Sequence, residues 1–271
     1  MPNKGFVCKK KYGQNFIDDP VLLARIADVC QWSGDEAVLE IGPGAGGLTR
    51  ALSERARQVV AVEIDRALEP ILARALADTS GVTVRFGDAL KMDLDRLMLD
   101  ICGAARYKVV ANLPYYITTP LIMHLLEDAS GVTEAAVMVQ SEVADRMTAA
   151  PGSKAYGAIT VMVQYRAQAE RAFSVSRRAF RPQPNVDSAV LHLVPYTEKP
   201  LQAKDETMLR SVVRAAFSQR RKTLANALSS LFGRESAMQA LAASDIDPGR
   251  RAETLSIAEF VHLADAFGTI D

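Results

Sequence analysis

The fold of this chain is decided at residues 38–49, which read Val-Leu-Glu-Ile-Gly-Pro-Gly-Ala-Gly-Gly-Leu-Thr. An apolar run, a glycine cluster and helix-compatible residues predict a strand, a tight turn and a helix. Gly42, Gly44 and Gly46 lack a Cβ atom, so the backbone can bend sharply and a ligand can approach it closely. The spacing is Gly-x-Gly-x-Gly, not the Gly-x-Gly-x-x-Gly of dinucleotide-binding sheets, although Gly47 fills the last place of that form.

An acidic residue ends the next apolar run. Residues 58–63 read as a second strand that finishes at Glu63. An acid at this position can accept hydrogen bonds from both hydroxyls of a ribose. The glycines alone are equally compatible with a turn that binds nothing, and the acid favours a cofactor that contains a nucleoside.

Strands and helices then alternate along the chain. Strands are expected at residues 37–41, 58–63, 82–86, 107–111 and 134–140, with helical patterns between them. This alternation predicts an α/β fold with a Rossmann-like, doubly wound, mostly parallel sheet, whose ligand crevice lies at the carboxyl ends of the strands.

Four conspicuous residues fall at that edge of the predicted sheet: Gly42, Glu63, Asp88 and Asn112. They come from four separate segments, so their convergence on one rim indicates a site more strongly than any of them alone.

Two more strands complete a sheet of seven. Residues 167–176 and 188–194 follow one another without a crossover helix, so they should pair antiparallel at one sheet edge. A proline-flanked polar linker follows, and the remainder reads as helical. We therefore expect a catalytic domain at residues 1–196 and a small all-helical domain at residues 197–271.

Composition narrows the class of protein. The chain has 271 residues, 49% of them hydrophobic, and a net charge of zero, which suits a sizeable core and excludes a disordered chain. Its three cysteines show no metal spacing and fit a reducing compartment. No apolar run reaches the roughly 18 residues of a membrane span, and the lysine-rich start lacks the apolar stretch of a signal peptide. We expect a cytoplasmic protein without a metal centre.

Asn112-Leu113-Pro114-Tyr115 is the motif that points to chemistry. The lone pair of an exocyclic amine such as adenine N6 is delocalised into the ring, so the amine is a poor nucleophile. Two acceptors aimed at its hydrogens, the Asn112 side-chain oxygen and a backbone carbonyl at Leu113 or Pro114, would favour a pyramidal, reactive nitrogen. Tyr115 offers a face for a base that has left its stack. Taken alone, the motif fits a strand-ending turn with an aromatic plug equally well.

Several motifs together resemble the ribosomal RNA adenine N6,N6-dimethyltransferases, whose bacterial members methylate two adjacent adenines near the 3′ end of 16S rRNA. The resemblance covers nearly the whole chain and lies chiefly in residues 13–16, 40–46, 63, 88, 112–115 and 180–188. The segment Phe-Ser-Gln-Arg-Arg-Lys-Thr-Leu at residues 217–224 narrows it further.

The resemblance implies a methyltransferase that uses S-adenosylmethionine. It assigns cofactor contacts to Asn15, Ile17, Gly42, Gly44, Glu63, Ile64, Asp88, Ala89 and Asn112. Within this set Glu63 would hold the ribose hydroxyls, Ile64 would pack on the adenine ring, and Asp88 would accept from the adenine amino group. Phe180 would stack on the target base opposite Tyr115, although position 179 is Ala where a second Phe is common.

Basic residues of the helical domain form the expected RNA footprint. Arg210 and Arg214 share one helix face, and Arg220, Arg221 and Lys222 follow in the next segment. The resemblance implies 16S rRNA in the small ribosomal subunit as partner, bound by a monomer.

Four alternatives stay open. DNA adenine methyltransferases share the logic of the adenine site, but they usually show Asp-Pro-Pro-Tyr and a target-reading domain. A 23S rRNA methyltransferase of the erythromycin-resistance type has a similar sheet, and a ribosome-assembly factor could keep the fold without turnover. A nicotinamide oxidoreductase is the weakest rival, because no pair of hydride-transfer residues is evident.

Overall fold

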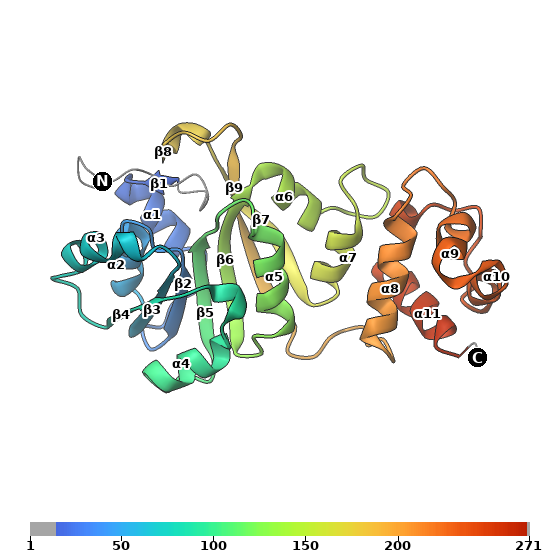
Figure 1. Ribbon diagram of the computed structural model, residues 1–271, viewed down its shortest axis with the longest axis horizontal. Coiled ribbons are helices and arrows are strands. Elements are labelled where there is room, and N and C mark those ends of the chain that lie inside the picture. Colours follow the sequence, from blue (N-terminus) through green and yellow to red (C-terminus); the bar gives the residue numbers. More distant parts are fainter. Residues whose placement is uncertain (1–14, 270–271) are drawn as a thin grey trace. The chain divides into compact units, whose positions relative to one another are not determined.

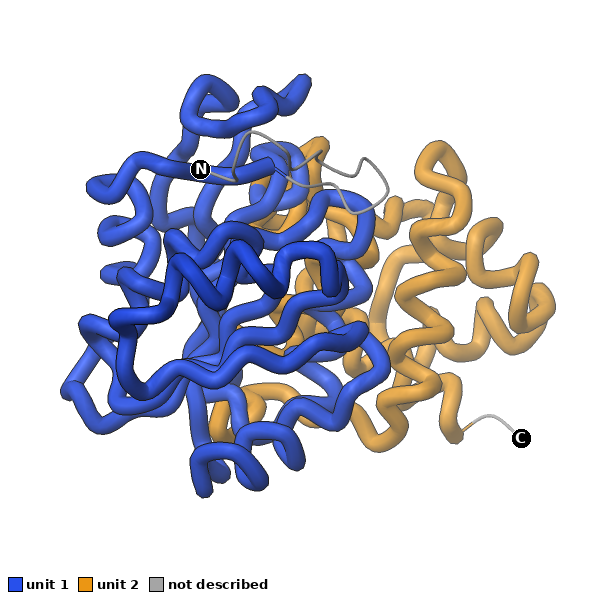
Figure 2. The backbone as a smooth tube through the Cα atoms, turned by 60° about the vertical axis from the view of Figure 1, so that its left-hand side comes forward, with its two compact units in different colours: residues 1–144, 169–195 blue, residues 145–168, 196–271 orange. Residues whose placement is uncertain are grey.

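A computed structural model describes residues 15–269 of the chain. Residues 13 and 14, the first half of the motif at residues 13–16, lie outside the described residues, as does the lysine-rich start. The chain divides into two compact units (Figure 2). The first unit runs to Ala144 and includes Ala169–Pro195, and the second consists of Asp145–Gln168 and the residues from Tyr196 onward.

The first unit is built on a seven-stranded sheet with the order β4-β3-β2-β5-β6-β9-β7 (Figure 1). Its strands are β2 (Ala37–Ile41), β3 (Gln58–Glu63), β4 (Val82–Phe86), β5 (Tyr107–Asn112), β6 (Val132–Gln140), β7 (Ala167–Val175) and β9 (Ser188–Pro195). From β4 to β6 all neighbours are parallel, and β9 runs antiparallel to β6. The predicted doubly wound sheet is confirmed, and the last two strands lie side by side at one edge as expected.

The central strands are buried on both faces because helices follow each of them. Every residue of β2 is buried, which its Val- and Leu-rich sequence predicts for a central parallel strand. The helices of this part are α1 (Pro20–Ala27), α2 (Gly47–Ser53), α3 (Glu69–Ala75), α4 (Leu94–Cys102), α5 (Thr118–Glu127) and α6 (Ser141–Met147). Short 3₁₀ turns stand at η2 (Arg66–Leu68), η3 (Ala89–Lys91) and η4 (Arg177–Ala179).

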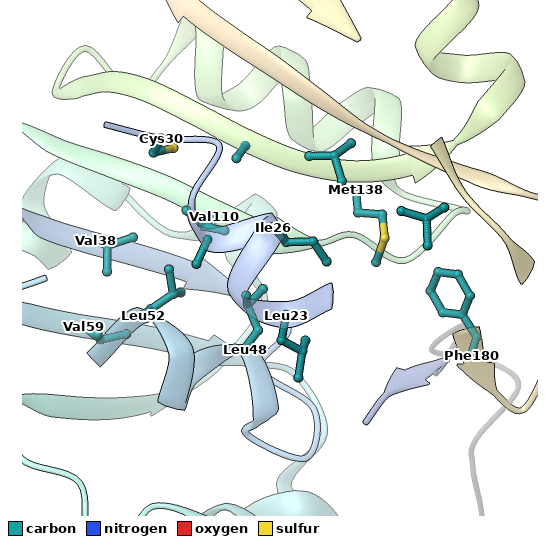
Figure 3. Close-up of a cluster of buried hydrophobic side chains, with 14 residues drawn as sticks. Leu23, Ile26, Cys30, Val38, Leu48, Leu52, Val59, Val110, Met138 and Phe180 are labelled. Atoms are coloured by element: carbon teal, nitrogen blue, oxygen red, sulfur yellow. The ribbon is translucent and has the colours of Figure 1, made fainter. Parts of the chain in front are cut away.

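One apolar cluster joins α1 and α2 to the sheet (Figure 3). Leu23 and Ile26 of α1 and Leu52 of α2 pack in the same cluster as Val38 and Val110 of the central strands. Pro20 begins α1, and the Asp19 carboxylate caps it by accepting from the amide of Val21 at 2.9 Å. Packing of α1 onto α2 holds the helix that follows the glycine turn.

A small second sheet was not predicted. Strand β1 (Phe16–Ile17) pairs antiparallel with β8 (Phe180–Arg181), so that Ile17 lies opposite Phe180 (Figure 1). This ladder ties the amino-terminal segment to the loop before β9.

The second unit is helical. It contains α7 (Ala158–Gln164), α8 (Glu206–Phe217), α9 (Leu224–Phe232), α10 (Arg234–Ala243), the 3₁₀ turn η5 (Ala252–Thr254) and α11 (Ile257–Phe267). The predicted caps are confirmed, because Asp205 accepts from the amide of Thr207 at 2.7 Å and Ser256 forms a capping box with Glu259.

The segments that form this unit differ from those expected from a single boundary at residue 196. Residues 145–168, which we placed in the first domain, belong to the second unit. The ring of Tyr156 lies 6.0 Å from that of Phe217, and Arg166 donates a 2.8 Å hydrogen bond to Glu206. These contacts hold the segment against α8. Among residues 15–269 no helix has both the length and the apolar character needed to cross a membrane.

Candidate active site

A single pocket at the carboxyl ends of β2, β3 and β5 gathers most of the residues expected in the site. It is lined by Asn15, Ile17, Gly42, Gly44, Glu63, Ile64, Asp88, Ala89, Asn112, Leu113, Pro114 and Tyr115, together with Phe16, Glu40 and Tyr116. The parallel strands end at this rim, so residues that are far apart in the sequence meet there.

The glycine turn has a backbone conformation that residues other than glycine rarely adopt. Gly42, Gly44 and Gly46 have φ angles of +75°, +57° and +83°. A Cβ atom on Gly44 would lie 2.8 Å from the ring of Phe16, so the close approach of that ring also requires glycine. Phe16 was not expected in the site, and it now forms part of the pocket wall above the turn.

Glu63 ends β3 beside this turn, and backbone amides hold its carboxylate. Its Oε2 accepts from the amide of Gly44 at 3.2 Å and its Oε1 from that of Asp65 at 2.8 Å. The side chain is buried, and burial raises its pKa while these amides lower it. The carboxylate is therefore fixed in position at the pocket wall.

Glu40 is a second buried acid in the pocket, and we did not expect it in the site. The residue is 1% exposed, and among the described residues its Oε2 has no hydrogen-bond partner. Burial, together with the charge of Glu63, raises the pKa of Glu40 to about 8, against a smaller lowering by the Thr49 hydroxyl. Its place two residues ahead of the glycine motif was the available signal.

Asn112 stands at the end of β5, where its side chain is oriented by the amino-terminal segment. Its Nδ2 donates a 3.1 Å hydrogen bond to the carbonyl of Asn15. A carbonyl oxygen only accepts hydrogen bonds, so the Asn112 side chain must turn Nδ2 toward Asn15. Its Oδ1 therefore points away from Asn15 and is not used in this bond. Asn112 therefore presents an acceptor at the wall of the pocket.

The residues after Asn112 form a rigid turn. The carbonyl of Pro114 accepts from the amide of Ile117 at 3.2 Å and from the hydroxyl of Thr118 at 3.1 Å. Both of its lone-pair directions are thus engaged, which leaves the Leu113 carbonyl as the better candidate for a second acceptor. The amide of Leu113 donates to the carbonyl of Met138 on β6, so the turn continues the sheet.

Two tyrosines contribute aromatic surface. Tyr115 is half-buried, and its hydroxyl lies 2.7 Å from the hydroxyl oxygen of the buried Ser188. Burial raises its pKa. Tyr116 is 54% exposed and lines the same pocket.

The structure does not bring Phe180 to the pocket. Its ring is fully buried and belongs to the apolar cluster that contains Met138 and Val190 (Figure 3). Phe180 does not line the pocket with Tyr115, and its stacking on the target base stays a prediction. Phe180 lies opposite Ile17 in the small sheet, and Ile17 packs against the same cluster.

Asp88 lines the pocket and also has a local role. Its Oδ1 accepts from the amide of Leu90 at 3.1 Å and so caps η3. Ala89 is buried beside it, and Ile64, which also lines the pocket, is 40% exposed. Asp88 and Ile64 thus come from the ends of neighbouring strands β4 and β3.

The basic residues of the second unit differ in their surroundings. Arg210, Arg214, Arg221 and Lys222 are exposed. The Arg220 guanidinium donates to the carbonyls of Lys154 and Tyr156 at 3.1 and 2.8 Å. Arg220 therefore ties two segments of its own unit together. In the part of the chain from residue 15 to 269, no group of His, Cys, Asp and Glu could hold a metal ion.

Comparisons with known proteins agree with one another. Residues 5–268 match the family described as ribosomal RNA adenine dimethylase. The ribosomal RNA small subunit methyltransferases A of Moorella thermoacetica and Geobacillus kaustophilus are 48% and 47% identical to the chain. These alignments cover 96% and 98% of this chain and 93% of each relative.

Two solved structures have the same architecture over most of the chain. The 23S rRNA methyltransferase ErmE superposes with a TM-score of 0.71 and 28% identity, covering 94% of this chain and 100% of that one. A dimethyladenosine transferase from Plasmodium falciparum gives a TM-score of 0.77 and 25% identity over 92% of this chain and 95% of that one.

Proposed function

The chain belongs to the ribosomal RNA adenine dimethylase family, and from this premise we propose that it dimethylates N6 of two adjacent adenines near the 3′ end of 16S rRNA. It is a methyltransferase with S-adenosylmethionine as methyl donor. The observation that carries the proposal is the orientation of Asn112, whose Oδ1 is left as an acceptor at the pocket wall by the bond from Nδ2 to Asn15.

The pocket residues fit S-adenosylmethionine. The left-handed glycines let a ligand approach the backbone, and the unpartnered Glu40 Oε2 suits a ligand that brings a hydrogen-bond donor. Glu63 would hold the ribose hydroxyls, Asp88 would accept from the adenine amine, and Ile64 would cover the adenine ring. When bound, the donor supplies an electrophilic methyl group on its sulfonium.

Asn112 and Leu113 would make the target amine reactive. Their oxygens accept the two N6 hydrogens and favour a pyramidal nitrogen with an available lone pair. This stabilisation grows as the new bond forms, so it lowers the barrier instead of merely tightening substrate binding. The methylated nitrogen is cationic and loses its proton readily, so the step requires no side-chain base.

Tyr115 and Tyr116 would hold the flipped adenine. Tyr115 is fixed by its bond to Ser188, and base–aromatic stacking contributes about 1–3 kcal/mol per base. We propose that the buried Phe180 supports this wall from the core.

The second unit would bind the RNA. Arg210 and Arg214 on α8 and the exposed pair Arg221 and Lys222 are suited to phosphate contacts, which position an RNA without reading its sequence. We propose that the protein acts as a monomer in the cytoplasm, with the first unit carrying the chemistry and the second unit the contacts to the ribosomal subunit.

The relatives favour the small subunit over the alternatives. The small-subunit methyltransferases A are 47–48% identical to the chain, whereas the 23S rRNA methyltransferase is 28% identical. The test is to incubate the protein with radiolabelled S-adenosylmethionine and small subunits that lack these methyl groups. Label should enter as N6,N6-dimethyladenine in 16S rRNA. Label in large subunits or duplex DNA instead, or none at all, would overturn the proposal, the last outcome favouring an assembly factor without turnover.

A further inference from the structure

A second, polar groove lies at the same rim of the first unit and has no role in the site described above. It is lined by Gln140, Ser141, Glu142, Arg177, Asn185 and Asp187. These residues come from the end of β6, the start of α6 and the loop on either side of β8.

The register of the strands places the groove next to the target-base pocket. Met138 on β6 pairs with Asn112 on β5, and Gln140 follows two residues later on the same strand. Gln140 in turn lies opposite Ser188 on β9, whose hydroxyl meets that of Tyr115 at 2.7 Å. Cross-strand partners are about 5 Å apart, so the groove begins one strand beyond the wall that Tyr115 forms.

The groove is held in shape by its own hydrogen bonds. The amide of Ser141 donates to the carbonyl of Asp187 at 3.0 Å. Arg177 donates through its amide to Asp187 Oδ1 at 2.9 Å and through Nη1 to the carbonyl of Asn185 at 3.0 Å. Within residues 15–269, no hydrogen bond engages the side chain of Gln140, so its amide is available to a ligand.

The charges of the groove select the kind of ligand. Among the lining residues Glu142 and Asp187 contribute two carboxylates and Arg177 one guanidinium, and the guanidinium of Arg171 donates a 2.8 Å hydrogen bond to Ser141 Oγ. Groups that donate hydrogen bonds, such as a ribose hydroxyl or an exocyclic amine, suit these acceptors. Val186, 44% exposed on the same loop, adds an apolar contact. The free amide of Gln140 matches the N6 and N7 edge of adenine, which glutamine can bind in a bidentate manner.

We propose that this groove binds the base and ribose of the nucleotide that adjoins the target adenine, with Gln140 reading that base as adenine. The inference rests on the proposed function and extends it to substrate selection. Of two adjacent adenines, one would occupy the pocket while its neighbour occupies the groove.

The experiment combines a protein variant with a substrate variant. Single-turnover methyl transfer to the target adenine is measured at saturating S-adenosylmethionine on unmethylated small subunits. The first substrate has both adenines, and in the second the adenine next to the target is replaced by guanine. Gln140→Ala should slow transfer to the first substrate about tenfold, as expected for one bidentate base contact. The guanine substitution should slow methyl transfer by the wild-type protein to a similar extent. Gln140→Ala acting on the guanine substrate should be no slower than either change alone.

Controls keep the result specific. Gln168→Ala removes an exposed glutamine of β7 outside the groove and should leave all rates unchanged. Gln140→Glu keeps the acceptor for N6 but loses the donor to N7, so it should give an intermediate rate even if the alanine variant folds poorly.

Two outcomes would overturn the proposal in distinguishable ways. In the first outcome the wild-type protein methylates the subunits, and Gln140→Ala does so at the same rate, or the rate losses from Gln140→Ala and from the guanine substitution multiply. Either result would show that the groove does not read the base and would leave the proposed function intact. No methylation of either substrate by the wild-type protein would refute the proposed function, and the groove proposal with it.

Discussion

The Asn112 side chain and the Asn15 carbonyl are joined by a 3.1 Å hydrogen bond across 97 positions of sequence. Since the carbonyl only accepts, the bond fixes the orientation of the Asn112 amide and makes Oδ1 the end that is available to a substrate amine. Asn15 immediately precedes β1, which pairs with β8. The amino-terminal segment thus closes the pocket and at the same time orients its most important acceptor.

Glu63 is predicted to anchor the ribose of S-adenosylmethionine. Glu63→Ala should weaken cofactor binding by about 1–3 kcal/mol, the loss expected for hydrogen bonds to a charged group. Isothermal titration calorimetry measures the affinity, and thermal unfolding checks that the variant is folded. Glu54→Ala, at an exposed acid of the same unit, is the matched control and should bind normally. Unchanged affinity in a folded Glu63→Ala protein would exclude Glu63 from the site.

Glu40 should make stability depend on pH. Burial raises its pKa from 4.5 to about 8, so between these values the folded chain keeps a proton that the unfolded chain releases. The free energy of unfolding should therefore fall as pH rises from about 5 to 8, by up to about 1.4 kcal/mol per unit from this group. Glu40→Gln is neutral throughout and should flatten this dependence in urea denaturation. The same slope in both proteins would contradict the assignment.

Part of the pocket was predictable from the sequence because several contributing residues end or follow an apolar strand. The ends of neighbouring parallel strands meet at one edge, so Glu63, Asp88 and Asn112 could be placed together without coordinates. The β1–β8 ladder could not be predicted, because two strands of two residues carry no periodicity. The burial of Phe180 in the cluster with Met138 and Val190 was not predicted either.

The role of Arg220 was hidden for a related reason. In the sequence it stands beside Arg221 and Lys222 as one basic cluster, whereas its partners are carbonyls at Lys154 and Tyr156. Those carbonyls belong to a segment that we had assigned to the other domain. Contacts between distant segments of irregular backbone leave no local pattern that residue type or spacing could reveal.

The two kinds of basic residue should therefore behave differently. Replacing Arg221 and Lys222 with Ala should reduce the slope of log K against log salt for RNA binding by about 1.5, at roughly 0.7–0.9 per lost phosphate contact. Arg220→Ala should instead lower the free energy of unfolding by about 1–3 kcal/mol through its lost hydrogen bonds, with a smaller effect on the slope. Salt titrations of RNA binding and urea denaturation separate the two effects. An unchanged slope in the double variant would mean that the pair is only a solvated surface.

The amine-activation mechanism is tested most directly by Asn112→Ala in single-turnover methyl transfer to small subunits at saturating S-adenosylmethionine. RNA binding is titrated alongside as the control and should persist, because phosphate contacts elsewhere supply most of it. Losing one preorganised acceptor should raise the barrier by about 2.7–4 kcal/mol, which slows transfer roughly a hundredfold or more. A near-normal rate in a variant that still binds RNA would contradict the mechanism.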